Sequence, residues 1–118
     1  MSDSIKHECA VTMLRLRKKP EHYLCKYNTE FYGYQKLSLL LEKQHNRGQD
    51  GAGIAGVKLH QEPGRPAFQM EKSARKMPLA NLLERIGGQI EILKKEHPEQ
   101  LHHYPLAGEL LLGHLRYG

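Results

Sequence analysis

The feature of this sequence that most restricts the possible folds is a glycine-rich turn between an amphipathic segment and an apolar one. It reads QHNRGQDGAGIA over residues 44–55, with three glycines among six consecutive positions. Glycine adopts backbone conformations that other residues resist, so the run predicts a tight turn from a helix into a strand. Arg47 and Asp50 flank this turn, and loops at a strand edge often carry functional side chains. An ordinary helix end with a solvated arginine is an equally good interpretation of this run alone.

The hydrophobic pattern predicts alternating strands and helices. Apolar runs that indicate strands cover residues 9–16, 51–59, 67–71 and 108–114. Amphipathic periodicity indicates helices over residues 34–44 and 78–93, and Gly87-Gly88 predicts a kink in the second helix or its division into two. The first strand run is apolar or small on both faces, which predicts a buried strand, and the last is apolar enough for the middle of a sheet. The order of these elements predicts an α+β fold.

Length and cysteine content indicate a single domain in a reducing compartment. With 118 residues the chain is long enough for one domain. Cys9 and Cys25 are far apart in the sequence, which suits free thiols better than a disulfide framework. Residues 2–6 are polar and unlike a secretory signal, and no stretch approaches the roughly 18 apolar residues of a membrane span. We therefore expect a cytoplasmic protein with no membrane partner.

The net charge of +5 permits contact with anions, but its distribution argues against nucleic acid. One small basic group consists of Arg15, Arg17, Lys18 and Lys19, whereas the other basic residues are interleaved with Asp and Glu. Aromatic and basic residues do not alternate, so the sequence offers no stacking platform for bases. We expect a solvated surface and no nucleic-acid partner.

Two further segments carry side chains suited to chemistry. Glu8-Cys9-Ala10-Val11 places a cysteine at the start of an apolar strand, and GHLRYG closes the chain over residues 113–118. Together with QHNRGQDGAGIA, and in this order, these segments resemble the glutaminase half of the amidophosphoribosyltransferases (glutamine phosphoribosylpyrophosphate amidotransferases). The central run differs from the QHRGQDGAGIA form by Asn46, and GHLRYG matches GH-x-RY. Ala10 stands where the family has glycine.

The resemblance implies a glutamine-hydrolysing site with Cys9 as its nucleophile. In this family the cysteine begins the mature chain, and its own α-amine, with a pKa of about 8, acts as the base. Residues 1–8 would then be a propeptide, removed between Glu8 and Cys9. Arg116 would hold the α-carboxylate of glutamine, because the guanidinium fork suits two-point binding. Supporting residues beside the cysteine would be Arg47, Gly48 and Asp50.

The resemblance also implies part of a larger fold. Family members form a four-layer αββα sandwich, the N-terminal-nucleophile hydrolase fold, and residues 9–118 correspond to the N-terminal part of that glutamine amidotransferase domain. The oxyanion-stabilising asparagine–glycine pair and the domain that binds phosphoribosylpyrophosphate with Mg²⁺ are not among these 118 residues. Some family members carry an iron–sulfur cluster, and no residue here is assigned to a cofactor. Half a sandwich leaves an apolar face unpaired, so we expect a truncated, inactive piece that forms a homo-oligomer.

Plainer interpretations of the same side chains follow from residue type alone. A cysteine in an apolar strand is more often an inert core residue than a nucleophile. Pairing of Arg116 with an acidic neighbour such as Glu109 is the simpler expectation for that arginine. Cys25 has no charged pattern around it and is expected in the core. The histidines fit no closed metal site, so we predict no metal ligands.

We therefore predict the glutaminase part of an amidophosphoribosyltransferase. The complete enzyme is a glycosyltransferase that uses ammonia from glutamine to convert phosphoribosylpyrophosphate to phosphoribosylamine, in the first step of de novo purine synthesis. Two other functions fit the same motifs. One is another class II glutamine amidotransferase with a different acceptor, and the other is a non-catalytic binding module on the same fold.

Overall fold

The computed structural model of this chain describes residues 9–44 and 49–117. Its α-helices are α1 (Pro20–Tyr27), α2 (Tyr32–Lys43) and α3 (Pro78–Glu96). Its strands are β1 (Cys9–Arg15), β2 (Gln49–Val57), β3 (Phe68–Ser73) and β4 (Leu110–Tyr117). Two short 3₁₀ segments, η1 (Pro98–His103) and η2 (Pro105–Ala107), connect α3 to β4. The predicted order of strands and long helices is confirmed.

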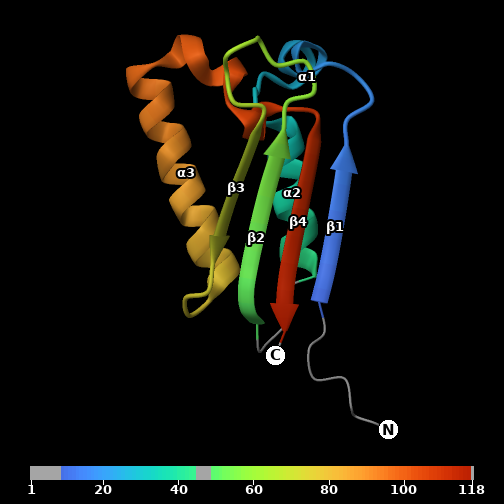
Figure 1. The fold of residues 1–118 in the computed structure, drawn as a ribbon, viewed down its shortest axis with the longest axis vertical. Coiled ribbons are helices and arrows are strands. Elements are labelled where there is room, and N and C mark those ends of the chain that lie inside the picture. Colours follow the sequence, from blue (N-terminus) through green and yellow to red (C-terminus); the bar gives the residue numbers. More distant parts are fainter. Residues whose placement is uncertain (1–8, 45–48, 118) are drawn as a thin grey trace, which may run out of the picture.

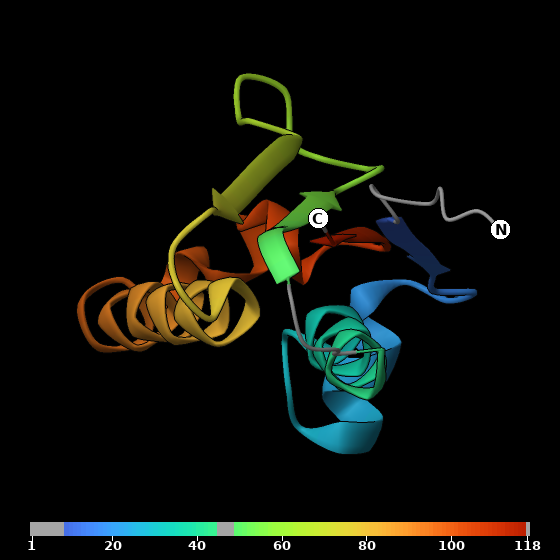
Figure 2. The same ribbon diagram turned by 90° about the horizontal axis from the view of Figure 1, so that it is seen from below.

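The four strands form one antiparallel sheet in the order β1-β4-β2-β3 (Figure 1). The first and last strands of the chain are therefore neighbours, and β4 lies inside the sheet, as predicted. Seen along the strands, α2 and α3 lie on the same side of the sheet (Figure 2). The fold is thus α+β, with one layer of helices on one layer of sheet, and the opposite sheet face carries no helix of the described chain.

Alternation along β4 separates a core face from an open face. Leu111 and Leu115 are fully buried toward the helices, whereas His114 and Arg116 are exposed on the other face. The core lies between the sheet and the two long helices. Its fully buried side chains are Leu37, Leu41, Ile54, Leu82, Ile86, Leu106, Leu111 and Leu115.

The helix α3 is continuous across Gly87-Gly88, so the predicted kink or division is wrong. Its buried residues recur at helical spacing through Leu82, Ile86 and Ile90, and this apolar stripe continues on both sides of the glycines. Apart from its chain neighbours and the nearby backbone of α3 itself, a methyl group built on either glycine would meet no atom within 4 Å. The two glycines therefore lie away from the packed face, where packing of the stripe outweighs their low helix propensity.

Replacing Gly88 by alanine is expected to raise the free energy of unfolding by about 1 kcal/mol, because alanine restricts the unfolded chain and costs no packing here. Urea denaturation followed by circular dichroism measures the change. The control is Gly64→Ala, at a turn residue with φ of 88°, which should lose stability although its surroundings are equally open. A Gly88→Ala protein no more stable than the parent would contradict a continuous α3.

Two further expectations are wrong, because the structure places each of the two elements where no other layer of the described chain covers the residues in question. The first strand was expected to be buried on both faces, but β1 lies at the sheet edge and leaves Val11 and Met13 exposed. Cys25 was expected in the core, but it lies exposed on α1, a short helix that buries none of its residues. Apolar content alone predicts burial poorly where the covering layer is absent.

Candidate functional site

The described parts of the three motifs reach one end of the sheet, through the pairing of the strands that carry them. Cys9 begins β1 opposite Arg116 of β4, and Arg116 in turn lies opposite Gly51 of β2. Because β1 and β2 both start where β4 ends, residues far apart in sequence form one row across neighbouring strands (Figure 1). The hydrophobic pattern places Arg116 just past the end of a strand, but in the structure this residue lies within β4. Arg47 and Gly48 fall outside the described residues.

A register shift in β2 places Asp50 at this same end. Gln49 pairs with Tyr117, whereas Gly51 pairs with Arg116, so Asp50 is an extra residue on its strand. Such a bulge bends the strand and redirects a side chain, and bulges are common beside functional sites. Asp50 is exposed and lines the groove described next. Most of the described part of the glycine-rich run is therefore strand, with its irregularity confined to the bulge.

A groove of about 630 Å³ runs along the open face from this row into the sheet. Its floor includes Gly51 and Gly53 of β2, and its charged and imidazole side chains are those of Asp50, Lys72, His114 and Arg116. A methyl group on Gly51 or Gly53 would lie 3.5 Å or more from its nearest neighbour, which is ordinary contact. Packing therefore does not demand glycine at these positions. Their effect is to leave the middle of the groove without side chains.

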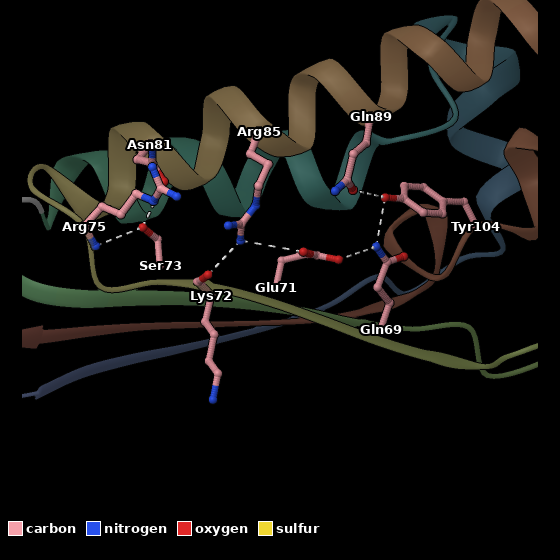
Figure 3. Close-up of polar contacts among 9 residues, drawn as sticks. All are labelled: Gln69, Glu71, Lys72, Ser73, Arg75, Asn81, Arg85, Gln89 and Tyr104. Atoms are coloured by element: carbon pink, nitrogen blue, oxygen red, sulfur yellow. Dashed lines mark hydrogen bonds and ion pairs between the residues drawn. The ribbon is translucent and has the colours of Figure 1, made fainter.

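The wall of the groove formed by β3 is held in place from the helix side (Figure 3). Arg85 of α3 donates a hydrogen bond to the carbonyl oxygen of Lys72 at 2.7 Å and lies 3.6 Å from the Glu71 carboxylate. The buried Ser73 hydroxyl donates to the Asn81 side chain at 2.9 Å. The Lys72 side chain extends away from α3, onto the open face. Contacts on one face of β3 thus fix the backbone that presents Lys72 on the other.

The expected pairing of Arg116 with Glu109 is wrong. Glu109 precedes β4 at the other end of that strand, where it is 5% exposed and its backbone carbonyl accepts a hydrogen bond from Leu16. Among the described residues, Arg116 and Lys72 have no ion-pair partner. Two cationic side chains therefore face one groove without an internal counter-charge bonded to them. Such a site attracts anions.

From the sequence, His114 stands out only as part of GHLRYG, without a role of its own, and Lys72 does not stand out at all. Both occupy the row that crosses the sheet at Gly53, with His114 on one side of this glycine and Lys72 on the other. The alternation in β3 could have revealed Lys72, because it shares its strand face with Phe68 and Met70. Only the pairing register of β2 with β3, however, places Lys72 beside Gly53 on the groove floor.

A second hollow, of about 400 Å³, lies between β3 and the C-terminal half of α3. The Tyr104 hydroxyl donates to Gln89 at 2.9 Å and accepts from Gln69 at 2.8 Å (Figure 3). Burial raises the pKa of Tyr104, although the hydrogen bond from Gln69 opposes the rise. These polar groups bond to one another, so this hollow belongs to the packing of α3 on β3 and is a weaker site candidate than the open-face groove.

The described residues contain no group of three or more His, Cys, Asp or Glu side chains arranged to hold a metal ion. The helices in the same part of the chain are too short or too polar to cross a bilayer. No protein-family model, curated protein or solved structure matches this chain. The resemblance to the amidotransferases therefore stays a prediction from the three motifs.

Proposed function

We propose that this chain is the N-terminal part of a class II glutamine amidotransferase domain, with Cys9 as the nucleophile and Arg116 as the anchor for the substrate carboxylate. The observation that carries the proposal is the row Cys9–Arg116–Gly51, formed by backbone pairing across three strands. Each of these residues comes from one of the three motifs that resemble amidophosphoribosyltransferases. A chance sequence resemblance has no reason to bring its parts together at one end of a sheet.

The reaction needs a free thiol and a base beside it. After cleavage between Glu8 and Cys9, the new α-amine takes the thiol proton through a water molecule, and the sulfur attacks the carboxamide carbon of glutamine. The C–N bond breaks, the proton returns to the leaving nitrogen, and ammonia departs. Water then hydrolyses the thioester to glutamate and restores the thiol. In the uncut chain the nitrogen of Cys9 is an amide and cannot serve as this base.

The charges of the groove suit a free amino acid. A guanidinium binds a carboxylate at two points, which fits the role of Arg116 toward the α-carboxylate of glutamine. Asp50, at the bulge, adds a negative charge to the same groove and can face the α-ammonium group of a zwitterion. A neutral ligand would leave both of these charges unmatched, and a purely anionic ligand would leave Asp50 unmatched, so the groove favours α-amino acids.

The open sheet face supports the further proposal that the complete domain is an αββα sandwich. Val11, Met13, Phe68 and Met70 lie on this face and are 56–70% exposed. Stacked sheets bury such faces against each other at about 10 Å separation. A second sheet over this face would also roof the groove and exclude water from the thioester. Self-association through the same face is the homo-oligomer we predict for the chain alone.

The acceptor of the ammonia is proposed from the motif pattern. QHNRGQDGAGIA and GHLRYG resemble amidophosphoribosyltransferases, so the proposed complete enzyme forms phosphoribosylamine in purine synthesis. A class II amidotransferase with another acceptor would use the same glutaminase residues. A non-catalytic module on this fold would keep the groove and leave Cys9 uncut and unreactive.

The test is intact mass spectrometry of the full-length gene product before and after treatment with a diazoketone analogue of glutamine. We expect loss of residues 1–8 and one adduct, located on Cys9 by peptide mapping. The exposed Cys25 is a built-in control, because a non-specific alkylator would label it as well. A well-folded product that keeps residues 1–8 and takes no adduct on Cys9 would reject catalysis and favour the binding module.

A further inference from the structure

We propose that Lys72 is a second carboxylate-binding residue of the groove and acts with Arg116 on the α-carboxylate of the amino-acid substrate. This inference rests on the proposed function, because it names a further contact to the same ligand. No sequence motif points to Lys72. The observations that do are its strand register, the orientation of its side chain and its lack of a charge partner.

The strand register places Lys72 of β3 and the strand β4 on either side of Gly53, which carries no side chain. Gly53 pairs with His114 on one side and with Lys72 on the other. Because β2 lies between them, β4 and β3 are two strand spacings apart, which is about 10 Å. Gly53 of β2 places no side chain in this space. A ligand group can therefore lie directly over this glycine, between side chains that rise from the two flanking strands.

Arg116 and Lys72 can reach one carboxylate from opposite sides of this floor. Arg116 lies about 7 Å further along the sheet, so its Cα is about 12 Å from that of Lys72. Both side chains are long, both line the groove, and together they span this separation with room for one carboxylate between them. The guanidinium supplies a directed fork, and the ammonium supplies a compact point charge.

An alternative role for Lys72 as a surface ion-pair partner has little support. The neighbouring carboxylate, Glu71, lies on the other face of β3 and contacts Arg85. The Lys72 ammonium has no ion-pair partner among the described residues. The bond from Arg85 to the Lys72 carbonyl meanwhile holds its backbone in place. The side chain is thus presented on a fixed strand toward the groove, which is what an anion contact requires.

The test is a titration of the full chain, followed by its backbone amide NMR resonances, with L-glutamine and with L-glutaminamide, which lacks the α-carboxylate. We expect L-glutamine to shift the resonances of Gly51 and Gly53 and L-glutaminamide to leave them in place. Lys72→Gln should weaken L-glutamine binding about tenfold, and Lys72→Arg should retain most of it. The matched control is Arg15→Gln, on the same sheet face at the other end of β1, which should bind as the parent does.

The outcomes separate this inference from the proposed function. If Cys9 takes the glutamine-analogue adduct while Lys72→Gln binds L-glutamine as tightly as the parent, the amidotransferase stands and the role of Lys72 is overturned. If Lys72→Gln weakens carboxylate binding while Cys9 stays unlabelled, the carboxylate contact stands and the amidotransferase fails. Absence of binding by any α-amino acid in the folded parent chain overturns the role of Lys72 as well.

Discussion

Replacing Cys9 by alanine is expected to abolish the release of ammonia from glutamine in the full-length enzyme, by about 10⁴-fold or more. The proposed reaction passes through a thioester on this sulfur, and no other group in the row with Arg116 and Gly51 can form one. Glutamine binding should survive, because the groove side chains that meet the ligand charges are unchanged. The measurements are ammonia production and isothermal titration calorimetry with glutamine.

Cys25→Ala is the matched control, since it removes the other thiol, from an exposed site on α1, and should leave ammonia release unchanged. To separate catalysis from processing, Cys9→Ala should also be made in a chain whose residues 1–8 have been removed by an added protease site. Ammonia release from that chain at the parental rate would reject Cys9 as the nucleophile. Loss of glutamine binding together with activity would instead indicate a structural role for this residue.

The fold class could be predicted because the elements carry their own periodicity. The stripe of Leu82, Ile86 and Ile90 in α3 is visible as spacing alone, and so are the apolar runs of the strands. The end of β4 could not be predicted in this way. The apolar run stops at His114, but the strand continues through Arg116 because β1 and β2 pair with it on both sides. Pairing between strands, not periodicity, sets that boundary.

The sequence names the motif residues of the candidate site, but it does not name the residues that lie beside them. Cys9 and Arg116 stand out by residue type and position, and the register places them opposite each other. Asp50 acquires its position from a bulge, and Lys72 from a β2–β3 register that no local pattern reveals. Register depends on which strands meet across long stretches of chain. A single sequence therefore names the candidate residues more readily than it shows which ones share a groove.

A large loss of stability is expected at Gly56, where Gly56→Ala should lower the free energy of unfolding by about 3 kcal/mol. A methyl group there would lie 2.6 Å from the Pro105 carbonyl oxygen and 2.8 Å from the Leu106 Cα. Both atoms belong to the backbone of η2, which packs on β2 and cannot yield as a flexible side chain could. Urea denaturation measures the loss, with the slope of the transition as a check on two-state unfolding.

The matched control is Gly53→Ala, on the same strand but the opposite face, where the nearest atoms are 3.8 Å away or more. It should change stability by no more than about 0.5 kcal/mol. Equal effects at Gly53 and Gly56 would contradict the packing of η2 against β2. The difference matters for the site, because a one-residue slip of β2 would turn Gly51 and Gly53 to the helix side. The close contact at Gly56 thus specifies the register that leaves the groove floor bare.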